Sequence, residues 1–279
     1  MFKLALIQML VRAGRKAENL NRAAEFIRQA AADGAEVVLL PEAMTLGWTD
    51  PSAESEADEI PDGQSCAHLR KLAKESGVYL CAGLIERAGS KIFNAAVFID
   101  PQGKVLLHHR KINELEIGHH LYALGDRLAV AQTPLGTIGV MICADGFAHG
   151  QVVGRTLGYL GADLILSPCA WAVPADHDNT KTSYGKIWID NYCPVAKDFR
   201  LWIAGASNVG PIESGPWKGR NCIGCSLVVG PSGEPALRGP YGVDAEAILS
   251  VEIQPEKRAA QGDGWARLWK SESDARQPH

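Results

Sequence analysis

Apolar residues are arranged along the chain in two ways, as short continuous runs and at helical spacing, and these predict two kinds of element. Short apolar runs bounded by Gly, Pro or charged residues are typical of buried strands. Such runs cover residues 3–9, 36–42, 78–84, 93–100, 105–111, 128–132, 138–143, 163–167, 201–207, 226–230 and 247–253. Helical spacing instead predicts helices over residues 18–33, 66–76, 152–162 and 187–199, the last interrupted near Pro194.

The order of these elements predicts an α/β fold with mixed sheets. Strands alternate with helices, but the turns "PQGK" and "TPLGT" each join two strands into a hairpin. With 279 residues, 46% of them hydrophobic, the chain can bury a large core without disulfides. We expect one domain over residues 1–255 and a polar tail or arm over residues 256–279, placed at an oligomer interface.

Composition and charge exclude several classes of partner. The net charge is −4 and no basic stripe is present, so nucleic-acid binding is not expected. No apolar run approaches the ~20 residues that span a bilayer, and the N-terminus lacks a signal-peptide pattern. Seven cysteines, an odd number, indicate reduced thiols and a cytoplasmic location. Cys222 and Cys225 form a CxxC without a second pair, so no metal site is expected.

Polar side chains follow three of the predicted strands at the point where each strand ends. "VVLLPE" ends in Glu42, "VLLHHRK" in Lys111 and "GVMIC" in Cys143. In α/β sheets, ligands bind beyond the carboxyl ends of the strands. A thiol there can act as a nucleophile whose pKa a nearby lysine lowers, a carboxylate can take its proton, and an ammonium can stabilise an oxyanion.

The segments that carry these residues resemble a known family. "LLPEAM", "HHRKIN" and "MICADGF" are similar, in order and wide spacing, to the three signature segments of the nitrilase superfamily, the carbon–nitrogen hydrolases. Flanking segments such as "GADLILSPCAW" and "LWIAGASNVG" extend the resemblance over residues 2 to 253. It implies a four-layer α-β-β-α sandwich, a Glu-Lys-Cys catalytic triad, no metal or cofactor, and homodimers or larger homo-oligomers packed through a helical face.

The resemblance also implies a role for each residue. Cys143 matches the nucleophile, Glu42 the general base and Lys111 the oxyanion-stabilising lysine, while the N–H of Ala144 is the second oxyanion donor. A further glutamate orients the lysine in this family. Glu114 and Glu116 both fit, and Glu114 is favoured because it lies nearer the strand end.

Other residues refine the branch of the family. Nitrile hydrolases of the superfamily typically carry Cys-Trp-Glu, whereas this chain has Ala144 and Asp145 after the cysteine, which favours amides. Trp171 is interpreted either as a wall of the substrate pocket or as a core residue. The loop "GPWKGRN" around Trp217 is expected at the rim of the pocket. Four histidines near Lys111 are expected to be solvated or structural, namely His108, His109, His119 and His120.

These observations predict a cytoplasmic amidase that hydrolyses a small-molecule carboxamide through a Cys143 thioester and releases ammonia. The main alternative is an N-carbamoyl-amine hydrolase, which also releases carbon dioxide. Nitrile hydrolysis, acyl transfer and a non-catalytic nitrilase-like interaction protein are less favoured. Apolar helix faces such as the stripe from Leu20 to Ile27 are where the chain could self-associate, unless they face their own sheet.

Overall fold

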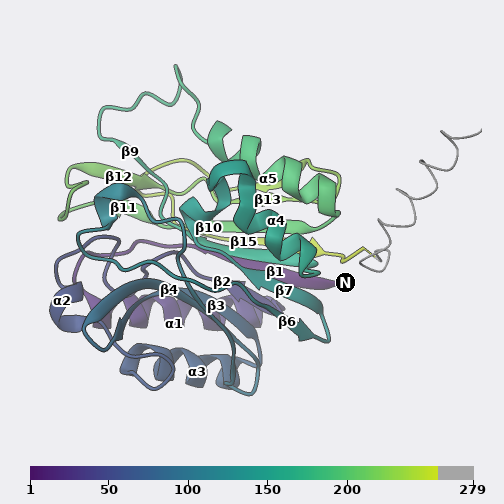
Figure 1. The fold of residues 1–279 in the computed structure, drawn as a ribbon, viewed down its shortest axis with the longest axis horizontal. Coiled ribbons are helices and arrows are strands. Elements are labelled where there is room, and N and C mark those ends of the chain that lie inside the picture. The colour runs from purple at the N-terminus through teal and green to yellow at the C-terminus, as the bar shows by residue number, and fades with distance from the viewer. Residues whose placement is uncertain (257–279) are drawn as a thin grey trace, which may run out of the picture.

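Two six-stranded mixed sheets lie face to face in the computed structural model, which describes residues 1–256 (Figure 1). The first sheet has the order β15 (Ala247–Ile253), β1 (Phe2–Gln8), β2 (Val37–Leu39), β3 (Tyr79–Ala88), β4 (Lys91–Ile99), β5 (Val105–Arg110). The second has the order β14 (Pro235–Arg238), β13 (Leu227–Val229), β10 (Trp202–Ser207), β8 (Leu164–Cys169), β7 (Gly136–Val140), β6 (Val130–Thr133). Each predicted strand run overlaps one of these strands.

Helices cover the outer face of each sheet. The helices α1 (Lys16–Ala32) and α3 (Gln64–Ser76) lie outside the first sheet, and α4 (Val152–Tyr159) and α5 (Lys186–Phe199) lie outside the second (Figure 1). The predicted four-layer α-β-β-α sandwich is therefore confirmed. The buried stripe of α1, which includes Leu20 and Ile27, packs on its own sheet and not on an outside surface. This stripe consequently supports no contact between copies of the chain.

Strand β1 shows why the strand runs are continuously apolar. Leu4 and Leu6 point into the core between the two sheets, and Ala5 and Ile7 point into the core between the first sheet and its helices. Successive side chains on a strand face opposite ways, so a strand that is covered on both faces needs apolar residues at every position.

Several smaller elements were not predicted from the sequence. A three-stranded sheet is formed by β11 (Val209–Pro211), β12 (Arg220–Ile223) and β9 (Ala172–Pro174). A short helix, α2 (Ala53–Glu56), and three 3₁₀ helices, η1 (Glu116–Gly118), η2 (Cys143–Phe147) and η3 (His149–Gln151), complete the described chain. Their lengths are too short for a periodic pattern to reveal them.

The predicted interruption at Pro194 is wrong, because α5 continues through it. A proline removes one helical hydrogen bond, and here the buried residues Trp188, Tyr192, Val195 and Ala196 hold the helix against the sheet on both sides of it. The tail predicted over residues 256–279 lies, apart from its first residue, outside the described residues. Within residues 1–256, no helix is both long and apolar enough to cross a membrane.

Candidate active site

The ends of β2, β5 and β7 meet where the two sheets face each other. Glu42 follows β2, Lys111 directly follows β5, and Cys143 begins η2 just after β7. The backbone N–H of Glu42 donates to the carbonyl of Cys169 at the end of β8, 3.2 Å away, and so ties the first sheet to the second. The three residues predicted from their strand ends are thus brought to one place.

Lys111 lies between two glutamates. Its Nζ donates to Glu42 Oε1 at 2.8 Å and to Glu114 Oε1 at 2.9 Å. The side chain of Asn94 on β4 donates to both carboxylates as well, at 2.7 Å to Glu42 and 3.0 Å to Glu114. The four side chains are buried. Of the two glutamates considered for the second position, the structure places Glu114 on Lys111, whereas Glu116 lies in η1, away from the buried cluster.

Burial and charge shape the protonation of this cluster. Burial raises the pKa of Glu42; the Lys111 ammonium opposes that shift and the Glu114 carboxylate adds to it, so the pKa stays above its usual 4.5. For Lys111, burial lowers the pKa, but the two carboxylates outweigh burial and leave its pKa well above the usual range. Lys111 is therefore held as an ammonium, and Glu42 can accept a proton more readily than an exposed glutamate.

Cys143 sits at a strained point of the backbone. Its φ angle is +43°, a left-handed conformation that is uncommon for any residue except glycine. Burial raises the pKa of the thiol, the neighbouring Cys169 adds to this, and Lys111 opposes it without reversing it. Lys111 lowers the pKa of Cys143 in the expected direction, but desolvation is the larger effect and the pKa remains raised. The thiol is therefore neutral at rest and needs a base such as Glu42 to take its proton.

The backbone next to Cys143 offers a second hydrogen-bond donor. Within the described chain, the N–H of Ala144 donates to no protein acceptor. The carbonyl of the same residue accepts a 2.6 Å hydrogen bond from Asn113 Nδ2, which holds the turn against the loop that follows Lys111. An unpaired N–H directly after a nucleophile is the arrangement that an oxyanion hole requires.

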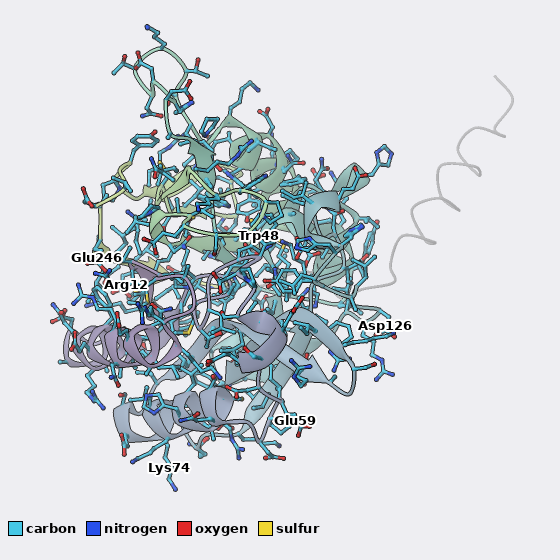
Figure 2. All side chains as sticks on the ribbon, turned by 90° about the vertical axis from the view of Figure 1, so that its left-hand side faces the viewer. Arg12, Trp48, Glu59, Lys74, Asp126 and Glu246 are labelled. Atoms are coloured by element: carbon cyan, nitrogen blue, oxygen red, sulfur yellow. The ribbon has the colours of Figure 1, made fainter. Side chains whose placement is uncertain are left out.

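Two tryptophans lie next to the cluster, one behind the other. The Trp48 ring centre lies 5.7 Å from Lys111 Nζ, and Trp217 packs edge-on against Trp48 with ring centres 4.9 Å apart. Figure 2 shows Trp48 in the middle of the molecule and Lys74 on its outer helix. The predicted loop around Trp217 therefore reaches the site through Trp48.

Trp171 fits the core interpretation, one of the two that the sequence left open. It is a buried core residue that stacks on Trp188 with ring centres 4.5 Å apart. It also lines a cavity of about 150 Å³ together with Tyr184, Trp188, Cys225 and Arg238. A direct contact between Trp171 and a substrate remains a prediction.

Three residues that organise this site were not predicted from the sequence. Asn94 is the single polar residue inside the apolar run "FNAAVFI", which was a usable signal. Asp145 was considered only as a departure from the nitrile-hydrolase pattern, yet it is fully buried and hydrogen-bonded to His109 at 2.8 Å. Trp48 carried no signal, because it lies in a loop without periodic structure.

The remaining histidines and cysteines form no second centre in the described part of the chain. His108 binds Glu86, and His119 and His120 bind backbone carbonyls, so these three are structural contacts near the surface. No group of three or more His, Cys, Asp or Glu side chains among residues 1–256 could hold a metal ion. Cys222 is buried and Cys225 half-buried, and both are free thiols.

Comparison with known sequences gives one family. The sequence profile described as carbon-nitrogen hydrolase matches residues 3–261. The omega-amidase NIT2-A of Xenopus laevis is 37% identical over 263 residues, which cover 90% of this chain and 88% of that protein. A nitrilase of Pyrococcus abyssi is 30% identical over 84% of this chain and 83% of its own length. The alignment to the omega-amidase NIT2 of Xenopus tropicalis, at 37% identity, covers 61% of this chain and 64% of that protein.

Solved structures give the same fold. An amidase from Nesterenkonia sp. AN1, which shows the result of Michael addition of acrylamide at its active site cysteine, has a TM-score of 0.76 at 22% identity and covers 96% of this chain and 100% of its own. A variant of the same amidase in complex with butyramide has a TM-score of 0.75 over 91% of each chain. At this level of identity the likeness bears on the fold alone.

Proposed function

The chain belongs to the carbon–nitrogen hydrolase family, and we propose that it is an amidase that cleaves the carbon–nitrogen bond of a small carboxamide through a thioester on Cys143. One observation carries this proposal. Lys111 Nζ binds Glu42 at 2.8 Å and Glu114 at 2.9 Å inside a buried centre that also contains the Cys143 thiol. A base, an oxyanion donor and a nucleophile are the three groups that acyl transfer needs.

Acylation begins when Cys143 Sγ attacks the carbonyl carbon of the amide. The thiol proton passes to Glu42, whose raised pKa suits it to this task. The carbonyl oxygen becomes an oxyanion and accepts hydrogen bonds from the Lys111 ammonium and the Ala144 N–H. Glu42 then returns the proton to the amide nitrogen, the carbon–nitrogen bond breaks, ammonia leaves and a thioester remains on Cys143.

Deacylation repeats these roles with water in place of the thiol. Glu42 takes a proton from a water molecule while the water oxygen attacks the thioester carbon. The Lys111 ammonium and the Ala144 N–H donate hydrogen bonds to the new oxyanion. When the carbon–sulfur bond breaks, the sulfur recovers the proton and the carboxylic acid leaves. Glu114 binds Lys111 throughout and keeps its ammonium aimed at the oxyanion.

We propose amides, and not the other substrates of the family, for two reasons. Omega-amidases are among the relatives of this chain, at 37% identity over 90% of its length. The residues after the nucleophile are Ala144 and Asp145, not the Trp and Glu typical of nitrile hydrolases. The cytoplasm and a homo-oligomeric state remain expectations from the sequence and the family resemblance.

The test is release of ammonia from a panel of short aliphatic amides, N-carbamoyl amines and nitriles. We expect amides to be hydrolysed, and we expect Cys143→Ala to lose at least about 10⁴-fold in kcat while its thermal unfolding is unchanged. Intact-protein mass spectrometry should detect the acyl group on Cys143. Ammonia accompanied by carbon dioxide from the carbamoyl amines alone would identify the N-carbamoyl hydrolase instead. Turnover that survives in Cys143→Ala would exclude the mechanism altogether.

A further inference from the structure

One buried carboxylate joins the two parts of the site that supply the oxyanion donors. Asp145 Oδ1 accepts the backbone N–H groups of Ile112 and Asn113, at 3.0 and 2.7 Å. Its Oδ2 accepts the N–H of Ile142 at 2.9 Å and lies 2.8 Å from His109 Nε2. A carboxylate has about four lone-pair directions, so this one is fully used by the protein.

The partners of Asp145 lie next to the residues that carry the chemistry. Ile142 directly precedes Cys143, whereas Ile112 and Asn113 directly follow Lys111. One side chain therefore fixes the backbone on both sides of the oxyanion position. Asn113 adds a second connection between the two segments, because its side chain donates a 2.6 Å hydrogen bond to the carbonyl of Ala144.

His109 anchors this carboxylate to the first sheet. It lies on β5, two residues before Lys111, and its side chain is 5% exposed, while Asp145 is 0% exposed. Burial raises the pKa of Asp145, but the bonds from His109 and from the backbone N–H groups outweigh it and leave the pKa below its usual range. Asp145 is thus an ionised acceptor, and His109 Nε2 is the donor of their shared hydrogen bond.

We propose that Asp145, held by His109, is a positioning residue that sets the separation between the Lys111 ammonium and the Ala144 N–H. The inference rests on the proposed function, since it concerns the oxyanion of that reaction. Asp145 uses all its acceptors on protein donors and so reaches no substrate. Loss of its bonds lets the loop after Lys111 move relative to the turn at Cys143, and small displacements of oriented groups cost large factors in rate.

This role makes a prediction that a purely structural role does not. Amide hydrolysis passes through an oxyanion and needs both donors in place. Thiolation of Cys143 by methyl methanethiosulfonate needs the thiol and its base but forms no carbonyl oxyanion. A displaced donor pair should therefore slow hydrolysis and leave the rate of thiolation nearly unchanged.

The experiment compares Asp145→Asn, His109→Leu and the matched control His108→Leu with the wild type. Leucine is chosen because it has no N–H that could replace the imidazole donor. His108 is adjacent on the same strand and lies 2.8 Å from a carboxylate of its own, Glu86. Successive side chains on a strand point to opposite faces, so His108 points away from Asp145. We expect kcat to fall roughly 10²-fold in Asp145→Asn and roughly 10-fold in His109→Leu, with KM and thiolation rate within about two-fold of the wild type. His108→Leu should keep the wild-type kcat.

His109→Leu is the decisive variant, because it removes one of the four hydrogen bonds to Asp145 and leaves the carboxylate in place. A wild-type kcat in His109→Leu overturns the proposal, and so does a parallel loss of hydrolysis and thiolation, which would mean that the whole turn has collapsed. If Asp145→Asn does not fold, His109→Leu and Asn113→Ala decide by the same criteria. Failure of the proposed function is recognised separately, by wild-type protein that releases no ammonia from any amide or by turnover in Cys143→Ala.

Discussion

Two clusters of polar side chains lie around the end of β5, and in both a glutamate is hydrogen-bonded to basic side chains at 2.6 to 2.9 Å. The inner cluster consists of Lys111, Glu42 and Glu114. The outer cluster consists of Glu86, Arg110 and His108. The inner side chains are at most 2% exposed, whereas Arg110 and His108 are 32% and 30% exposed.

The two clusters differ in how many basic side chains each glutamate has as partners. In the outer cluster two bases serve one carboxylate: burial raises the pKa of Glu86, but Arg110 and His108 outweigh it and the pKa is lowered. In the inner cluster one ammonium serves two carboxylates, and burial together with Glu114 keeps the pKa of Glu42 raised. Bond lengths are alike in both, so the ratio of charges and the access of water decide whether a glutamate keeps its charge or can take a proton.

The largest expected change in kcat distinguishes Glu42 in the inner cluster from Glu86 in the outer cluster. Glu42→Gln should lower kcat by roughly 10²–10⁴-fold, because the base that serves both acylation and deacylation is lost. Glu86→Gln, at the same kind of hydrogen bond in the outer cluster, should leave kcat near the wild type. Steady-state and single-turnover kinetics on a hydrolysed amide measure both. Equal losses in the two variants would mean that the inner cluster has no special chemistry.

The next largest expected change in kcat distinguishes Lys111 in the inner cluster from Arg110 in the outer cluster. Lys111→Met should lower kcat by roughly 10²–10³-fold with a smaller change in KM. The ammonium of Lys111 interacts more strongly with the oxyanion of the transition state than with the neutral carbonyl of the bound substrate. Arg110→Met keeps contact with the Phe93 ring, over which the guanidinium now lies at 4.0 Å, and should retain the wild-type kcat. Single-turnover rates decide the matter. A Lys111→Met enzyme with normal kcat and only a raised KM would make Lys111 a binding residue.

A smaller effect should distinguish the two glutamates that follow Lys111. Glu114→Gln should cost about 10-fold in kcat, less than Glu42→Gln, because Glu114 acts by aiming Lys111. Glu116→Gln should have the wild-type kcat, since Glu116 lies in η1 and not in the buried cluster. The reverse order of the two variants in the same kinetic assay would transfer the orienting role to Glu116.

The smallest effect concerns pH. Glu42 must be ionised to act as a base, and its pKa is raised, so kcat/KM should decline on the acid side with a midpoint above 4.5. The pKa of Glu86 is lowered in the folded protein, so its contribution to stability is complete above 4.5 and is lost as pH falls through the folded pKa. Activity should therefore be lost before the outer cluster weakens the fold.

Two titrations check this order. One follows kcat/KM against pH, and the other follows the thermal midpoint against pH in the wild type and in Glu86→Gln. The variant should show a flatter thermal midpoint below pH 4.5 than the wild type. An acid limb of kcat/KM at or below 4.5 in the wild type would contradict the raised pKa of Glu42.

Local pattern was enough to predict most of the architecture and part of the site. Short continuous apolar runs located the strands, because a strand that is covered on both faces is apolar at nearly every position. Spacing of period 3.6 located the main helices, because one helix face packs on a sheet. The same runs stopped at Glu42, Lys111 and Cys143, so the strand ends could be named before any fold was known. The family resemblance then supplied the four layers, which the structure confirms.

Where two residues of the same type lie close together in the sequence, only the tertiary structure shows which of them belongs to the site. His108 and His109 are adjacent, and only the position of the second sheet determines that His109 faces Asp145 while His108 faces Glu86. Glu114 lies in a loop and Glu116 begins the short helix η1, so no periodic pattern relates their spacing to the direction of their side chains. The raised pKa of Cys143 likewise depends on burial by distant segments. A periodic sequence specifies which faces are apolar, but which charges meet inside is set by how those faces pack.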